Sequence, residues 1–194
     1  MRLILASGSA RRRELMTMCG YEFSVIPCAA EEEHSAASPA ELVERLSLAK
    51  ARAMFDSLPE DEKAEAVVVG SDTVVVLDGR IIGKPADEAD AFDILKAESG
   101  KTNVVFTGVA VVSAAGESVA HDEATVRFAE LTDDEINAYI ATGEPMDKAG
   151  AYAIQGRFSL FINGIEGSYH TVVGLPVHLL YPMLAARGIL PNWM

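Results

Sequence analysis

The sequence predicts an α/β protein with a mixed β-sheet. Three observations favour this class. Short apolar or β-branched runs, such as Leu3–Ala6 and Ala66–Leu77, alternate with segments of helical periodicity. Capping signatures open two of the helical segments, at Ser38 and at Thr132. The dipeptide Asp78-Gly79 between β-branched runs is typical of a hairpin turn.

The N-terminal segment predicts a strand, a turn and a helix in succession. Leu3–Ala6 is a short apolar run that ends in the small residues Ser7–Ser9. Arg11–Cys19 follows with the periodicity of a helix. We expect a second strand at Phe23–Ile26 and an acidic loop of small residues over Pro27–Ser38.

The next helix has a well-marked start. Ser38 is expected to cap it, with Pro39 at the first helical position and Glu41 at the third. These residue types satisfy the free N–H groups of a first turn, so we expect a helix that runs to about Phe55.

The middle of the chain predicts a buried strand that turns a corner. Ala66–Val69 and Thr73–Leu77 are apolar and largely β-branched, and we interpret Gly70-Ser71-Asp72 between them as the corner. Asp78-Gly79 then turns the chain into a returning strand at Arg80–Ile82.

The second half continues the alternation of strands and helices. Helices are expected at Ala86–Glu98, from Thr132 to about Thr142, and at Pro176–Ala186. Strands are expected at Val104–Phe106, Val109–Val112, Ala124–Phe128 and Ser159–Ile162. No linker or repeat divides the sequence, so we interpret residues 1–194 as a single domain with room for two lobes.

Composition and charge limit the classes of function that this protein can have. A net charge of -13 makes a grip on a nucleic acid polymer unfavourable, so a phosphate must be bound by a local cluster of basic residues. Cys19 and Cys28 form neither a disulfide framework nor a zinc pattern, which favours a reducing, cytoplasmic setting. No stretch is long and apolar enough to predict a membrane-spanning segment.

Residues Ser7–Arg12 form a candidate phosphate cradle where a strand passes into a helix. Backbone N–H groups at a helix start, two hydroxyls and adjacent guanidinium groups all favour an anion. Alternatively, the serines cap the helix and the arginines are solvated.

Asp72 is a candidate functional carboxylate because it interrupts an apolar run. A buried carboxylate is costly unless a cation or a metal ion compensates it. Lys84, in Gly83-Lys84-Pro85, is the natural cationic partner in the sequence. The alternative, that Asp72 only ends a strand, is weakened because the apolar run resumes directly after it.

A third candidate stretch, Asp147–Gly156, combines small residues with Lys148 and Gln155. Glycines allow the backbone to approach a ligand closely. Gln155 carries both a donor and an acceptor and could contact the edge of a base, or it could be a structural loop amide.

Together these stretches resemble the Maf family of nucleotide pyrophosphatases along essentially the whole chain. The resemblance is carried by Leu5–Arg12, Gly70–Val75, Gly83–Pro85, Glu144–Gly156 and Val173–Pro176, in that order. It implies a fold like that of the ITP pyrophosphatases, with a twisted mixed β-sheet flanked by helices and two lobes around a cleft. It also implies hydrolysis of a nucleoside triphosphate to the monophosphate and pyrophosphate with Mg²⁺ or Mn²⁺, and a homodimer.

The resemblance also implies roles for individual residues. Asp72 matches the catalytic base of the family, and Glu32 matches another of its functional positions. We expect Glu32 and Asp72 to hold the metal ion, or Asp72 to orient and deprotonate a water. Substrate-binding positions are matched by Ser7, Arg12, Lys50, Lys84 and Lys148. Arg11, Thr73 and Gln155 match the branch that acts on dTTP and UTP. Departures are Ala10, where proline is commoner, Arg13, and a one-residue uncertainty of register within Glu31–Glu33.

Two other functions are compatible with these residues. The chain could be a nucleotide-binding regulator of septum formation and cell division that does not turn over its ligand. It could also be a pyrophosphatase for 7-methyl-GTP or for purine triphosphates such as ITP.

Overall fold

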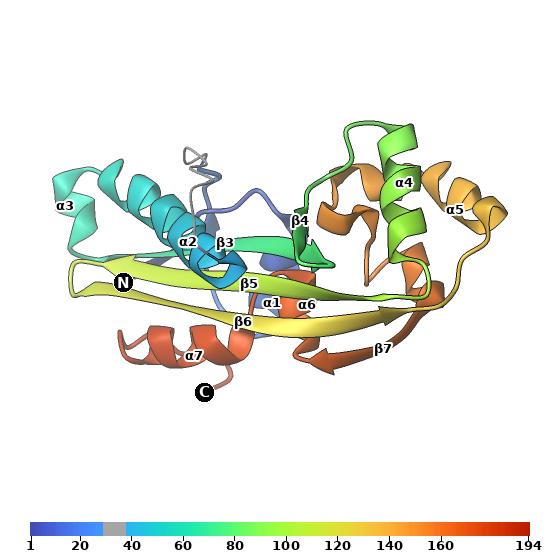
Figure 1. The fold of residues 1–194 in the computed structure, drawn as a ribbon. Coiled ribbons are helices and arrows are strands. Elements are labelled where there is room, and N and C mark those ends of the chain that lie inside the picture. Colours follow the sequence, from blue (N-terminus) through green and yellow to red (C-terminus); the bar gives the residue numbers. More distant parts are fainter. Residues whose placement is uncertain (29–37) are drawn as a thin grey trace. The chain divides into compact units, whose positions relative to one another are not determined.

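The computed structural model describes residues 1–28 and 38–194, and within them seven strands form one mixed sheet in the order β2-β1-β3-β5-β6-β7, with β4 on β3 (Figure 1). The strands are β1 (Arg2–Leu5), β2 (Ser24–Val25), β3 (Ala66–Leu77), β4 (Arg80–Ile82), β5 (Thr102–Ser113), β6 (Gly116–Phe128) and β7 (Ile162–Gly167). The helices are α1 (Ala10–Met18), α2 (Pro39–Asp56), α3 (Glu60–Lys63), α4 (Glu88–Glu98), α5 (Asp133–Ile140), α6 (Tyr169–Val173) and α7 (Val177–Ala185). Three short 3-10 helices are η1 (Glu144–Asp147), η2 (Ala149–Ala151) and η3 (Arg157–Phe161). The α/β class and the mixed sheet predicted from the sequence are confirmed.

The chain divides into two compact units. Unit 1 comprises residues 1–72, 107–122 and 174–194, and unit 2 comprises residues 73–106 and 123–173. Each unit has its own hydrophobic core, so each is described separately below.

In unit 1, β1 lies between two parallel partners. Arg2–Leu5 pairs with Ala66–Val69 of β3, and Ile4 and Leu5 pair with β2. Helix α2 covers one face of this part of the sheet and α7 lies on the opposite face (Figure 1). Side chains from β1, β3, β5 and α2 form the core of the unit, among them Ile4, Val68, Ala110 and Met54.

The predicted corner at Gly70-Ser71-Asp72 is wrong, because β3 runs without a break from Ala66 to Leu77. Gly70 is needed for packing and not for a turn. A Cβ there would collide with the carbonyl oxygen of Ser47 and lie 2.8 Å from the backbone nitrogen of Ala51. Gly108 on β5 is covered in the same way, since its Cβ would lie 2.5 Å from the Ser47 hydroxyl. The two glycines therefore let α2 approach the sheet backbone closely.

Unit 2 is built around an aromatic core. The ring of Phe158, which is 1% exposed, packs against Phe128, Tyr139, Tyr152 and Phe161 at centroid distances of 4.9 to 5.6 Å. Strands β3, β5 and β6 contribute side chains to this core, and β7 packs a side chain against it.

Several predicted elements are confirmed with their caps. The Ser38 hydroxyl accepts from the Glu41 N–H, and Thr132 and Glu135 form both halves of a capping box. Asp78 and Gly79 both have positive φ, at 49° and 78°, as a two-residue hairpin turn requires.

The predicted strand at Ser159–Ile162 is wrong for most of its length. Arg157–Phe161 forms η3, and β7 begins only at Ile162. A 3-10 helix has three residues per turn, so Phe158 and Phe161 lie on one face and their rings pack 5.4 Å apart. An aromatic-rich run of this kind has no period that separates it from a strand over five residues.

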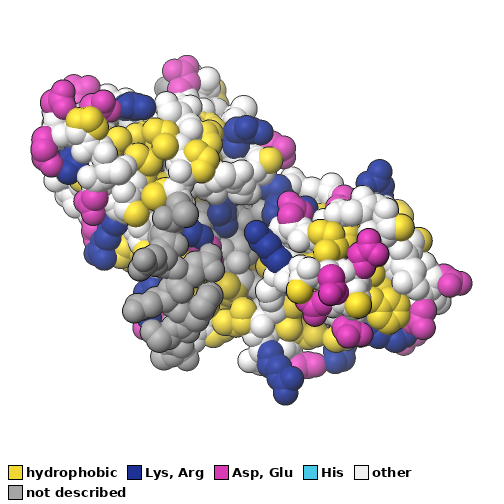
Figure 2. Space-filling model, turned by 90° about the horizontal axis from the view of Figure 1, so that it is seen from above, with side chains coloured by type: hydrophobic (Ala, Val, Ile, Leu, Met, Phe, Trp, Pro, Cys, Tyr) yellow, Lys and Arg dark blue, Asp and Glu magenta, His cyan; other side chains and the backbone are white. Residues whose placement is uncertain are grey.

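On the face that Figure 2 shows, Asp and Glu side chains gather over α3. Within residues 1–28 and 38–194, no helix has the length and hydropathy needed to cross a bilayer.

Candidate functional site

The start of α1 in unit 1 is organised around two serines and an arginine. Ser9 caps the helix by accepting from the Arg12 N–H at 3.5 Å, and Ser7 is 6% exposed. The Ser7 hydroxyl accepts from the Ser9 N–H at 3.3 Å and from Nη1 of Arg12 at 3.1 Å. Ser9 therefore caps the helix, and the Arg12 side chain turns back to contact Ser7.

Arg12 is also held by a distant segment. Its Nε donates to the carbonyl oxygen of Gly174 at 2.8 Å, 162 residues further along the chain. Burial lowers the pKa of the Arg12 guanidinium, the Asp72 carboxylate opposes this shift, and Arg11 adds to it. Because an arginine stays charged even when its pKa is lowered, Arg12 is a fixed cation in a desolvated position.

Asp72 and Lys50 form an ion pair at the same place in unit 1, between Oδ1 and Nζ. Their side chains are only 14% and 15% exposed. Residues 70 and 72 share one face of β3, and Lys50 lies one turn of α2 after Ser47, which covers Gly70. The close packing of α2 on the sheet thus positions this lysine beside the carboxylate.

The structure therefore has a cation beside Asp72, as expected, and this cation is Lys50. The sequence alone points to Lys84 as the partner. Removing one partner of such a pair would leave a poorly solvated charge, which is strongly unfavourable. Lys84 belongs to unit 2.

Ser71 is a residue whose importance sequence reasoning missed. It is fully buried, and its hydroxyl lies 2.7 Å from the carbonyl oxygen of Gly108 and 3.0 Å from that of Gly174. Gly174 thus contacts both Ser71 and Arg12, so one carbonyl links the strand that carries Asp72 to the start of α1. A polar residue inside a β-branched run was the available signal.

In unit 2, the segments of Lys84 and Lys148 are tied together. Lys84 follows β4 and is exposed, and the preceding Gly83 carbonyl accepts from the Gly150 N–H at 3.0 Å. Gly150 has a φ of 73°, a conformation that favours glycine. The Lys148 ammonium pairs with Asp147 and donates to the carbonyl oxygen of Glu144 at 3.3 Å.

The three residues matched to nucleotide selectivity lie on different elements. Arg11 is half-buried in the first turn of α1, and Thr73 follows Asp72 on β3. Gln155 is exposed at a turn between η2 and η3. Arg11 belongs to unit 1, and Thr73 and Gln155 belong to unit 2.

Glu32, the other carboxylate predicted to bind metal, lies outside the described residues. Among residues 1–28 and 38–194, no group of three or more His, Cys, Asp or Glu side chains gathers as a metal site. Asp72 supplies one carboxylate beside a cluster suited to phosphate. Mg²⁺ is commonly held by one or two carboxylates together with substrate phosphates and water, so this donor set fits such an ion.

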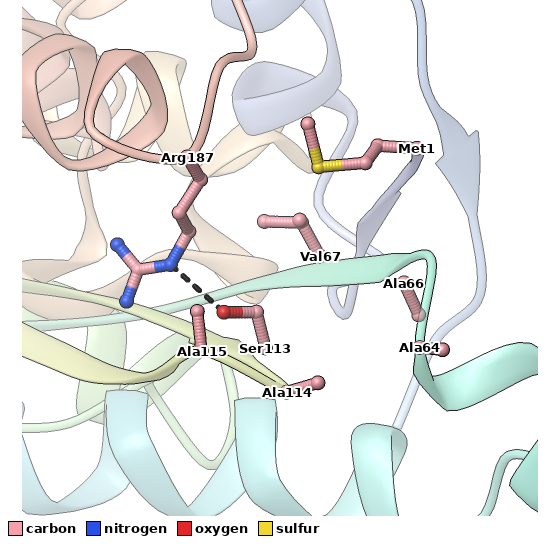
Figure 3. A pocket seen from close by; sticks show the side chains of 8 residues that line it. All are labelled: Met1, Ala64, Ala66, Val67, Ser113, Ala114, Ala115 and Arg187. Carbon is pink, nitrogen blue, oxygen red and sulfur yellow. Dashed lines mark hydrogen bonds between the residues drawn. The ribbon is translucent and has the colours of Figure 1, made fainter.

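Unit 1 also has a small pocket, which is lined mainly by apolar side chains (Figure 3). Its volume is about 90 Å³, whereas small-molecule sites usually reach roughly 300–1,000 Å³. Its one charged side chain, Arg187, donates to the Ser113 hydroxyl at 3.1 Å and to the Met183 and Gly116 carbonyls at 2.8 and 3.0 Å. The Arg187 guanidinium therefore stabilises the fold through these hydrogen bonds.

The mixed sheet and the Ser7–Arg12–Lys50–Asp72 cluster define an α/β protein with a desolvated cationic centre around one carboxylate. The chain belongs to the Maf family, since the family model described as Maf-like protein matches residues 2–187.

Named relatives agree with this assignment. A dTTP/UTP pyrophosphatase of Symbiobacterium thermophilum is 51% identical over 187 residues, covering 96% of this chain and 94% of that protein. The dTTP/UTP pyrophosphatase of Moorella thermoacetica is 48% identical over 191 residues, covering 97% of this chain and 96% of that protein. One from Bacillus cereus is 44% identical over 180 residues, covering 92% of each chain.

Proposed function

We propose that this protein hydrolyses a nucleoside triphosphate between its α- and β-phosphates. The observation that carries the proposal is the convergence of Ser7, Arg12, Lys50 and Asp72 in unit 1 from three separate parts of the sequence. A desolvated cationic cluster around one carboxylate suits a polyanion together with an activated water. The dTTP/UTP pyrophosphatases to which the chain is similar support the same reaction class.

In the proposed reaction, a water oxygen forms a bond to the α-phosphorus and the bond from that phosphorus to the bridging oxygen breaks. Pyrophosphate leaves and the nucleoside monophosphate remains. Asp72 orients the water and accepts its proton, as a general base must. Positioning and electrostatics do most of the work, because phosphoryl-type transfer asks little covalent chemistry of the protein.

Cationic side chains stabilise the charge that develops on the phosphate oxygens. Arg12 is preorganised for this role because Ser7 and Gly174 hold its guanidinium. We assign Lys50 to the same charge, and Lys84 and Lys148 as the family resemblance implies.

A divalent cation completes the proposal. Asp72 and Glu32 would hold Mg²⁺ or Mn²⁺. When bound, such an ion neutralises phosphate charge and lowers the pKa of bound water.

For the substrate, we propose dTTP and UTP. Arg11, Thr73 and Gln155 match the branch with this preference, and the named relatives carry the same substrates in their names. Gln155 is assigned to the base because its amide offers a donor and an acceptor together.

The proposal is tested by pyrophosphate release with Mn²⁺ on dTTP, UTP, CTP, ITP and 7-methyl-GTP in parallel. We expect the highest kcat/KM for dTTP and UTP. Preference for ITP or 7-methyl-GTP would reassign the substrate. Absence of pyrophosphate with every nucleotide, despite measurable binding, would favour the regulator of septum formation.

Asp72→Asn tests the catalytic assignment. The amide keeps the shape but cannot take a proton, so we expect turnover to fall by roughly 10²–10⁴-fold, with an unchanged circular dichroism spectrum. Wild-type turnover in this variant would exclude Asp72 as the base.

We also propose a cytoplasmic homodimer, without a nucleic acid or membrane partner. Light scattering of the purified protein tests the oligomeric state, with a mass twice that of the 20.7 kDa chain expected.

A further inference from the structure

The turn that carries Gln155 is fixed at both of its ends. Tyr152 precedes it and Phe158 follows it, and these residues are 6% and 1% exposed. Their rings pack against each other with centroids 5.5 Å apart. Gln155 is exposed and lies between these two buried residues, so the aromatic core of unit 2 fixes the backbone on both sides of it.

Two side chains from outside the turn bond its backbone. The Tyr139 hydroxyl, at the end of α5, accepts from the Ala153 N–H at 3.2 Å. The Glu144 Oε2 atom, at the start of η1, accepts from the Arg157 N–H at 2.9 Å. These two bonds stand two residues before and two residues after Gln155.

Tyr139 and Glu144 also interact through charge. Burial raises the pKa of the Tyr139 hydroxyl, and the negative charge of the Glu144 carboxylate raises it further. The hydroxyl therefore stays protonated and accepts from the Ala153 N–H, so Tyr139 and Glu144 together form a bridge that holds the backbone on both sides of the turn.

Gly156 shows how closely the carboxylate is seated. A Cβ at this position would lie 2.6 Å from Glu144 Oε2. The φ of Gly156 is -110°, which any residue can adopt, so its backbone conformation does not require glycine. The absent side chain is what makes room for Glu144 under the turn.

We propose that Tyr139 and Glu144 are positioning residues that fix the orientation of Gln155 and thereby set the choice of nucleobase. The inference rests on the proposed function, in which Gln155 contacts the base. Neither residue needs to touch the nucleotide, because both act through the backbone on either side of Gln155.

A fixed turn matters because a carboxamide can serve two opposite patterns. Thymine and uracil present an acceptor at position 4, whereas cytosine presents an amino donor there. A Gln amide rotated by half a turn exchanges its donor and its acceptor, so a freely moving Gln155 would suit either base. Discrimination between thymine or uracil and cytosine therefore requires contacts that fix the backbone from which the Gln155 side chain extends.

The test compares Tyr139→Phe and Glu144→Ala with Glu144→Gln, which keeps an oxygen acceptor for the Arg157 N–H. The readouts are the ratio of kcat/KM for dTTP to that for CTP, and the ratio of Kd for CMP to that for dTMP. The second ratio needs no hydrolysis, so it tests the inference even if the proposed reaction fails. Gln155→Ala is measured in parallel, and Asp134→Asn, exposed on α5, is the control.

We expect Tyr139→Phe and Glu144→Ala to lower both ratios about fivefold to tenfold, the effect expected from loss of one or two hydrogen bonds. The loss should arise mainly from a raised KM for dTTP. Glu144→Gln should restore most of the selectivity, and Asp134→Asn should change nothing. Melting temperatures identify any variant that fails to fold, and Tyr139→Phe changes a single atom.

Unchanged ratios in folded Tyr139→Phe and Glu144→Ala, with a reduced ratio in Gln155→Ala, would overturn the inference and leave Gln155 as the base contact. Unchanged ratios in Gln155→Ala as well would overturn both assignments. Absence of hydrolysis by the wild type, with a Kd ratio that falls in the two variants, would overturn the proposed reaction and support the inference.

Discussion

Arg12 makes two contacts that need the planar shape of a guanidinium. Its Nη1 donates to Ser7 and its Nε donates to the Gly174 carbonyl. A lysine ammonium is a single point donor on a flexible stem and cannot hold both positions at once.

We therefore expect Arg12→Lys to lower kcat/KM for dTTP by about tenfold or more, although the charge is kept. The matched control is Arg13→Lys, because Arg13 is the next residue of α1 and is exposed. Equal rates for wild type and Arg12→Lys would mean that charge alone is required at this position.

Glu98, at the end of α4, is a fully buried acid that the proposed reaction does not use. Its Oε1 atom accepts from the Asn103 amide at 2.8 Å, and its Oε2 atom has no partner among the described residues. Burial raises the pKa of Glu98 to about 8, and the Asn103 hydrogen bond opposes this shift. The titratable group that faces it is Tyr152, whose hydroxyl contacts Asn103.

This raised pKa predicts a stability that falls as the pH rises. Between the ordinary value of 4.5 and about 8, the folded protein keeps the Glu98 proton and the unfolded chain has released it. Stabilisation is therefore complete below pH 4.5, is lost progressively up to about pH 8, and is absent above it.

The expected loss across this window is several kcal/mol, at about 1.36 kcal/mol for each pKa unit. Urea unfolding of wild type and Glu98→Gln at intervals from acid to alkaline pH measures it. The wild-type curve minus the Glu98→Gln curve should decline through the window. A flat difference would mean that Glu98 is ionised in the folded protein.

The candidate site was only partly predictable from residues. Asp72 could be recognised because a carboxylate inside an apolar run needs compensation. Its pairing with Lys50 could not, because 22 residues separate them and their meeting depends on how α2 packs. The bridge of Tyr139 and Glu144 left no signal in the sequence, since a tyrosine and a glutamate near a turn are common in surface helices.

At the scale of elements, the contact of α2 with the sheet carries a strong constraint. Gly70 on β3 and Gly108 on β5 both lie against the backbone of this helix. Backbone atoms cannot swing aside as a flexible side chain does, so an added methyl group must displace the whole helix.

We expect Gly70→Ala to destabilise the protein by about 2–3 kcal/mol, measured by urea unfolding. Gly83→Ala is the matched control, because nothing lies within 4 Å of a Cβ there and its φ is not in the left-handed range. If both variants unfold at the same urea concentration, α2 is less closely packed than the structure indicates.

Elements with a chemical start signal were predicted well, and those defined by tertiary packing were not. The capped helices α2 and α5 and the β3–β4 hairpin follow from local residues. The unbroken course of β3 through Gly70 depends on a helix that packs from elsewhere. Similarly, η3 depends on the aromatic core it enters, and the short α3 and α6 have no period long enough to identify.

At the scale of the whole molecule, the net charge of -13 predicts weak association with nucleic acid polymers. In fluorescence anisotropy with labelled single-stranded and double-stranded DNA, we expect no rise up to about 10 µM protein at about 50 mM salt. A rise that weakens linearly with the logarithm of salt concentration would mean that a basic patch outweighs the overall charge.

The division of the chain into units determines when, during synthesis, each unit has all of its residues. All of unit 2 lies within residues 73–173, whereas unit 1 also needs residues 174–194. Ser7 and Arg12 are synthesised before unit 2, yet the Gly174 carbonyl that bonds Arg12 is made 162 residues after Arg12. The cluster of Ser7, Arg12, Lys50 and Asp72 therefore gains the Gly174 contact only after the aromatic core of unit 2 has all of its residues.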